Sequence, residues 1–159
     1  MVKKMNREID INKIEVVQNW PPNIEELKKH FPMEPGVIFA YKGKIYNPFN
    51  IEITLDLMIH EATHFEQQGE DTEGWYEKYI NDKQFRFEQE LQAYAAQYEF
   101  LETVVNNKIL KTKLFTMAEL LSGPLYGNMI PFEKAESAIR HYRKLEVRDL
   151  ENEKNEKFN

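Results

Sequence analysis

Residues 52–67 read EITLDLMIHEATHFEQ, and the interpretation of the whole chain starts from this stretch. Its apolar residues recur at the three- and four-residue spacing of one helical face: Leu55, Met58, Ile59, Ala62 and Phe65. Gly69 follows, and glycine commonly ends helices because it adopts left-handed backbone angles without a steric cost. The pattern therefore predicts a helix that stops at Gly69.

His60-Glu61-Ala62-Thr63-His64 lies inside this predicted helix. Residues four apart on a helix project from the same face, so both imidazoles can reach one metal ion. Glu61 is turned by about 100° from His60, which lets its carboxylate act on a water at the metal without binding the metal itself. The spacing is thus typical of a zinc site with two ligands and a general base.

A catalytic zinc needs a third protein ligand. The extended pattern that supplies a third histidine would have glycine and histidine where this chain has Gln67 and Glu70. The other histidines, His30 and His141, have no ligand spacing with a partner. A third histidine is therefore not expected, and a carboxylate from another helix becomes the candidate.

The long helix predicted downstream offers Glu88, Glu90 and Glu99. Glu90 borders the apolar stripe of that helix, whereas Glu88 lies about 200° away around the helix axis. An acidic group at an apolar edge usually has a partner, and a metal is one such partner. Ala93, one turn from Glu90, would let the two helices approach closely, so Glu90 is the favoured third ligand.

The remaining elements indicate an α+β fold that is mainly helical, with a small antiparallel sheet or hairpin on the N-terminal side. The expected elements are a strand in Ile9–Val17, a helix Ile24–His30 capped by Asn23, a hairpin of Val37–Tyr41 and Lys44–Tyr46, a short helix carrying Trp75, Tyr76 and Tyr79, a long helix from about Lys83 to Val105 capped by Asp82, a short helix Thr116–Leu121 and a last helix from Pro131 to about Leu150. We expect one domain over residues 1–150 and a polar tail over 151–159.

Composition narrows the possible functions. The chain has 159 residues, a net charge of -6 and no cysteine. The acidic balance disfavours nucleic-acid binding, which needs a basic surface. The absence of cysteine excludes disulfides and cysteine-based zinc fingers, leaving histidine and carboxylate as metal ligands. No signal-peptide or membrane-spanning pattern is visible, so we expect a cytoplasmic protein, in a cell or in a phage-infected host, or a protein of the virion.

Several stretches resemble the gluzincin metallopeptidases, which carry HExxH on one helix and a ligating glutamate on the next long helix. They are HEATHFEQQG (60–69), GWYEKYI (74–80), RFEQELQAYAAQYEF (86–100) and LSGPLYGN (121–128), and together they resemble a group of small HExxH proteins common in bacteriophage genomes. The resemblance covers roughly residues 52–130. It implies a zincin-like domain with His60, His64 and Glu90 as zinc ligands and Glu61 as the base.

The expected reaction is hydrolysis of an amide bond in a peptide or protein. Zinc lowers the pKa of a bound water to about 7, and Glu61 would take its proton and pass it to the leaving amine. Tyr126 and His141 are candidates for stabilising the oxyanion, and Tyr126 is favoured because its loop recurs in the resembling proteins.

Two other functions stay open. The chain could be a non-catalytic structural or assembly protein stabilised by zinc, for example in a phage particle and bound to a phage or host structural protein. It could also be a metal-free helical interaction domain in which the motif is accidental. Trp75, Tyr76 and Tyr79 are interpreted as packing residues, and Gln67 as either a neighbour of the site or a solvated side chain.

Overall fold

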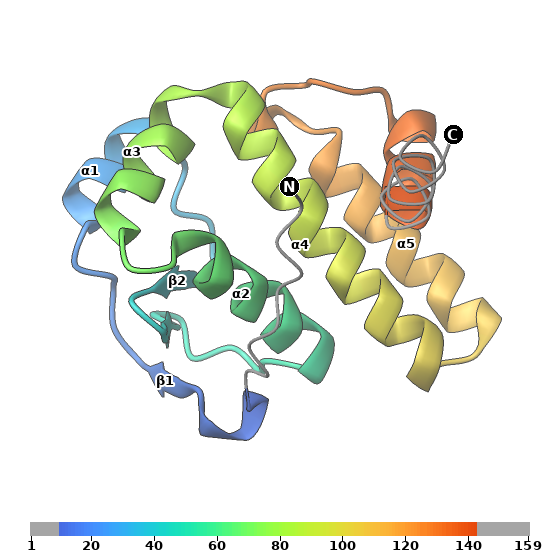
Figure 1. Cartoon of the computed structure of the whole chain (residues 1–159), viewed down its shortest axis with the longest axis horizontal. Coiled ribbons are helices and arrows are strands. Elements are labelled where there is room, and N and C mark those ends of the chain that lie inside the picture. The colour runs from blue at the N-terminus through green and yellow to red at the C-terminus, as the bar shows by residue number, and fades with distance from the viewer. Residues whose placement is uncertain (1–9, 143–159) are drawn as a thin grey trace, which may run out of the picture.

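Helices α2 (Leu55–Gln68) and α4 (Lys83–Val104) pack along each other and form the centre of the molecule (Figure 1). This computed structural model describes residues 10–142. On one side of the pair lie α1 (Ile24–His30), α3 (Thr72–Asn81) and a small sheet; on the other side α5 (Asn107–Leu121) packs against α4. A helix over 132–142 closes the described chain. The fold is α+β and mainly helical, as predicted.

The sheet is mixed rather than antiparallel. Its strands are β1 (Glu15–Val17), β2 (Phe39–Tyr41) and β3 (Lys44–Tyr46), in the order β1-β3-β2. The predicted hairpin of β2 and β3 is confirmed, with Lys42 and Gly43 both at positive φ in its two-residue turn. β1 pairs with β3 in parallel, because the intervening chain crosses over through α1 and returns in the same direction.

Near the N-terminus, one expectation is confirmed only in part and another is wrong. The strand covers only the end of the predicted Ile9–Val17 segment, because the Asp10 side chain accepts a hydrogen bond from the Asn12 amide and starts a 3₁₀ turn, Ile11–Lys13. Asn23 makes no capping hydrogen bond to α1. Its backbone, at φ −96° and ψ 19°, lies in a turn rather than in the extended conformation of a cap.

The predicted helix before Gly69 is confirmed, but its buried face is not the apolar one. Leu55 is 59% exposed, and of the five apolar residues only Ala62 is buried. The face turned to the protein interior carries polar side chains instead: Asp56, His60, Glu61, Thr63, His64 and Gln68. Buried polar groups need partners, and a face with so many of them is a candidate functional site as well as a packing surface.

The helices after α2 begin at side-chain caps. Asp71 caps α3, and Asp82 caps α4 as predicted. The helix predicted to start at Thr116 begins ten residues earlier, at the cap Asn106, and Thr116 lies inside α5 with its hydroxyl bonded to the Thr112 carbonyl. The spacing of buried residues along α5 continues through Thr116, so this threonine does not interrupt the helix.

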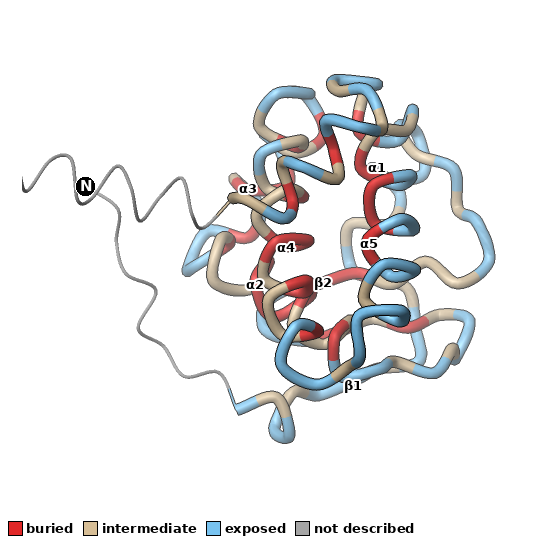
Figure 2. The backbone as a smooth tube through the Cα atoms, turned by 90° about the vertical axis from the view of Figure 1, so that its right-hand side faces the viewer, coloured by how far each residue is buried: buried red, intermediate tan, exposed pale blue. Residues whose placement is uncertain are grey.

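Two apolar clusters flank the polar face of α2. One joins α4, α5 and the last helix and contains Tyr94, Tyr98, Leu101, Leu114, Met117, Ala118, Leu121, Tyr126, Ala135 and Ile139. The other joins α1, the sheet and α3 and contains Leu27, Phe39, Tyr41, Trp75, Tyr76 and Ile80. Figure 2 shows the buried segments gathered along these inner surfaces. No helix in the described range is long and apolar enough to cross a membrane.

Some predictions fall outside residues 10–142. They are Ile9 at the start of the first strand, the continuation of the last helix to Leu150, the domain end at residue 150 and the polar tail 151–159.

The α5 packing can be tested with two neighbouring leucines. Leu121 is fully buried and Leu120 is 49% exposed. We expect Leu121→Ala to lower the free energy of unfolding by about 2–5 kcal/mol through the cavity it leaves, and Leu120→Ala by less than about 0.5 kcal/mol. Chemical denaturation measures both, and equal losses would contradict the assigned face of α5.

Candidate metal centre

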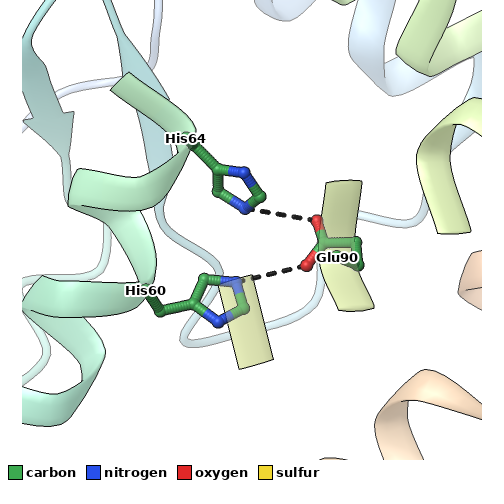
Figure 3. A group of neighbouring side chains, drawn as sticks. All are labelled: His60, His64 and Glu90. Carbon is green, nitrogen blue, oxygen red and sulfur yellow. Dashed lines mark hydrogen bonds and ion pairs between the residues drawn. The ribbon is translucent and has the colours of Figure 1, made fainter. Parts of the chain in front are cut away.

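His60, His64 and Glu90 meet between α2 and α4 (Figure 3). His60 Nε2 lies 3.2 Å from Glu90 Oε2, and His64 Nε2 lies 3.4 Å from Glu90 Oε1. Each residue offers one ligand atom, and these atoms lie within 4.8 Å of one another. The three residues predicted as ligands are therefore brought together in a buried cluster that could hold a metal ion.

Local geometry explains why the three groups meet. The two histidines are one helical turn apart on α2, and Glu90 projects from the facing side of α4. Ala93, one turn after Glu90, is fully buried, and Ala62 on α2 is also buried. Small side chains let two helices approach closely, as predicted for Ala93. Glu88 lies on the exposed side of α4, where it accepts a hydrogen bond from Gln84.

A chain of hydrogen bonds sets the proton position on His60. Gln97 Nε2 donates to Asp56 Oδ2 at 2.8 Å, so Gln97 turns its Oε1 toward His60 Nδ1, 3.1 Å away. Burial opposes the charge on Asp56, but hydrogen bonds from Thr54 and Gln97 outweigh it and lower the pKa of the carboxyl. A carboxylate and an amide oxygen only accept, so His60 Nδ1 must carry its proton.

His64 is held in the same way by different residues. Gln67 Nε2 donates to the Gln89 backbone carbonyl at 3.0 Å and to Gln92 Oε1 at 2.8 Å. Because a carbonyl only accepts, this arrangement directs Gln67 Oε1 to His64 Nδ1 at 2.8 Å. His64 Nδ1 therefore also carries a proton. Gln67 is thus a neighbour of the site, the first of the two roles left open by the sequence.

A proton on each Nδ1 leaves the Nε2 lone pairs pointing at the Glu90 carboxylate, a repulsive arrangement unless a positive charge lies between them. Bound protons can supply this positive charge. Burial disfavours a charged His64, but Glu90 outweighs burial and raises the pKa of His64 to about 9. Burial likewise raises the pKa of Glu90, yet the two histidines lower it overall. A divalent cation supplies the same charge to atoms already oriented as ligands, so the residues fit a metal.

Glu61 lies beside the cluster without joining it. The residue is only 6% exposed and lines the same cavity as the cluster. The pKa of Glu61 is raised overall, and burial is the largest cause. Glu90 also raises this pKa, whereas the two histidines lower it. A buried carboxylate with a raised pKa next to a candidate metal site has the properties of a general base.

Tyrosine hydroxyls surround Glu90. Tyr79 donates to Glu90 Oε1 at 2.6 Å. Tyr126, in the 3₁₀ turn Pro124–Tyr126, is hydrogen-bonded to Tyr94, whose ring contacts His60. Burial, together with Glu90, raises the pKa of both Tyr79 and Tyr126 well above 10, so both hydroxyls keep their protons.

The site opens into a cavity of about 140 Å³. Its wall includes His60, His64, Glu90, Glu61 and Tyr126, so the structure places the predicted base and the preferred oxyanion donor in one space. His141 belongs to the last helix and does not line this cavity.

Sequence reasoning missed several residues of the site. Tyr79, interpreted as packing, bonds directly to Glu90, while Asp56 and Gln97 orient His60. One available signal was periodicity: Asp56 precedes His60 by four residues, and Gln97 follows Glu90 by seven, so each lies on the same helical face as a ligand.

We expect Gln97→Met to weaken zinc binding by about 10- to 100-fold, because His60 loses the acceptor that orients it. Gln84→Met, a matched change on the exposed side of α4, should leave the affinity unchanged. Competition with a chromophoric chelator measures both. Unchanged affinity in Gln97→Met would show that the Asp56–Gln97 pair does not act on the metal site.

No family model matches this chain, and neither a curated protein nor a solved structure shows significant similarity to it. The functional assignment therefore rests on the geometry of the site and on the sequence motif.

Proposed function

We propose that this protein is a zinc metallopeptidase of the gluzincin type, with a zincin-like domain, that hydrolyses an amide bond. One observation carries the proposal. Two histidines protonated at Nδ1 direct their Nε2 atoms to the buried Glu90 carboxylate, and Glu61 lines the same cavity.

The donor set favours zinc among the divalent metals. Two imidazole nitrogens and one carboxylate oxygen are the ligands of many catalytic zinc sites, while calcium and magnesium prefer oxygen alone. Three protein ligands leave a coordination position open, as catalysis requires. A zinc ion bound there would polarise a substrate carbonyl and acidify a water molecule.

The residues of the chain supply the rest of the mechanism. Glu61 takes a proton from the attacking water and returns it to the leaving nitrogen, a role suited to a carboxylate whose pKa is raised by burial. Tyr126, which keeps its proton, donates a hydrogen bond to the carbonyl oxygen as negative charge develops on it. Asp56 and Gln97 hold His60 in the tautomer that a metal requires.

The burial of Glu61 distinguishes this function from a purely structural zinc site. Burying an ionisable group usually destabilises a fold, and a metal site that only joins two helices does not need a further carboxylate in the cavity wall. Such a cost is typical of functional sites, where a group must be poised for reaction.

Metal content is the first test. Protein purified in the presence of zinc should contain about one zinc ion per chain by elemental analysis, and His64→Ala should lose it and melt at a lower temperature. Less than about a tenth of a zinc ion per chain, with no stabilisation on adding zinc, would instead support the metal-free interaction domain.

Glu61→Gln tests catalysis. The amide keeps the size of the side chain but cannot accept the proton, so kcat should fall by about 10²- to 10⁴-fold while zinc stays bound. Glu88→Gln, on the exposed side of α4, is the control. Hydrolysis of a library of peptides and blocked amino-acid amides, followed by mass spectrometry, provides the readout. If the wild type cleaves nothing and Glu61→Gln changes no property of the zinc-loaded protein, the structural role is favoured.

A further inference from the structure

The cavity at the site is small. Its volume of about 140 Å³ is well below the roughly 300–1,000 Å³ of pockets that enclose drug-sized ligands. Its outer walls come from Leu27 of α1, from the 31–38 loop, from β2 and from Leu125. One amide group with a single side chain fits such a space better than several consecutive residues of a polypeptide.

The cavity wall is also uncharged outside the reactive cluster. Among the residues between 10 and 142 that line it, His60, Glu61, His64 and Glu90 are the only histidine or acidic residues, and none is lysine or arginine. The rest is aromatic or aliphatic apart from tyrosine hydroxyls. A charged side chain entering this space would lose its hydration without gaining a partner, which is unfavourable, whereas an apolar one would gain from burial.

The outward-facing carbonyl on the sheet edge beside the cavity already has two hydrogen-bond donors. β2 is an edge strand, and an extended peptide could in principle add to it through backbone hydrogen bonds. In this antiparallel hairpin the pairs Tyr41↔Lys44 and Phe39↔Tyr46 exchange backbone hydrogen bonds, so the carbonyls of Tyr41 and Phe39 point toward β3. Ala40 lies between them in a non-bonded pair, and its carbonyl therefore points away from β3. That carbonyl accepts from Gln68 Nε2 at 2.8 Å and from the Tyr76 hydroxyl at 2.6 Å.

A carbonyl oxygen has two lone pairs, and these two bonds use both. Ala40 is moreover buried. An incoming strand would have to displace two buried hydrogen bonds before forming its own at this position. The Ala40 carbonyl is thus closed to the backbone hydrogen bond that an added strand would form with it.

We propose that the site acts on a compact, uncharged amide that bears one apolar side chain, and does not act on an internal segment of an extended polypeptide. The proposal rests on the proposed hydrolase function. It combines three independent features: the small volume, the uncharged wall and the occupied Ala40 carbonyl.

Binding to the zinc-loaded Glu61→Gln protein tests this inference separately from turnover. The probes are N-acetyl-phenylalaninamide, N-acetyl-lysinamide and a blocked octapeptide of glycine and serine with one central phenylalanine, each titrated by calorimetry. We expect the phenylalanine amide to bind at least tenfold more tightly than the other two. An octapeptide that binds as tightly as the small amide, or failure of the small amide to bind, would overturn the inference.

A second experiment frees the Ala40 carbonyl. The double variant Gln68→Met, Tyr76→Phe in the Glu61→Gln background should improve octapeptide binding relative to the small amide by several-fold. A matched double variant, Gln84→Met, Tyr46→Phe, changes the same residue types away from the cavity and should leave the ratio unchanged. An unchanged ratio in both would show that the Ala40 carbonyl does not limit access.

These outcomes also separate this inference from the proposed function. Selective binding of the small amide by a zinc-loaded protein whose wild type hydrolyses none of the probes would refute the hydrolase and leave the recognition intact. Cleavage of the octapeptide in preference to the small amide would support the hydrolase and refute the proposed selectivity for a small amide.

Discussion

Two imidazole nitrogens face one buried carboxylate, and the structure around them is organised to maintain this arrangement. His60, His64 and Glu90 lie at the contact of α2 and α4, the two helices at the centre of the fold. Their lone pairs point inward, so the cluster is stable only with positive charge at its middle. Most of the unusual features of the protein, including the polar inner face of α2, follow from this requirement.

Glutamine side chains make that polar face compatible with burial. An amide can donate at one end and accept at the other, so it links a group that only accepts to an imidazole N–H. Gln97 does this between Asp56 and His60, and Gln67 between the Gln89 carbonyl and His64. A fully connected polar network of this kind holds both rings in one orientation, which a directional metal site requires.

The apolar clusters on either side give the site its environment. Aromatic side chains from α3 and from the turn around Tyr126 surround the reactive groups and limit the water around them. Arg86 links the segments that form these walls. Its guanidinium donates hydrogen bonds to the carbonyls of Tyr79, Ile80 and Leu125 and lies over the ring of Phe31. Low hydration strengthens electrostatic interactions within the cavity, which suits the role of base proposed for the buried Glu61.

The sequence alone determined the features that depend on local spacing. Histidines four apart place two imidazoles on one face of any helix, the caps and the turn residues start and end most elements, and the wheel position of Glu90 favours it over Glu88. The α+β class and the hairpin could be predicted on the same grounds. The parallel pairing of β1 and the exposure of Leu55 could not, because each depends on contacts between segments distant in sequence. The start of α5 was predicted wrongly although its cap, Asn106, is a local signal.

Only the tertiary structure decided how the site is completed. Local periodicity shows which residues share a face, but the partner across a helix contact depends on the rotation and approach of both helices. That packing brings Gln97 to His60, the Tyr79 hydroxyl to Glu90 and two donors to the Ala40 carbonyl. These contacts join residues 11 to 37 positions apart, and no repeat or motif in the chain encodes them, because hydrogen-bond partners are chosen by geometry in space.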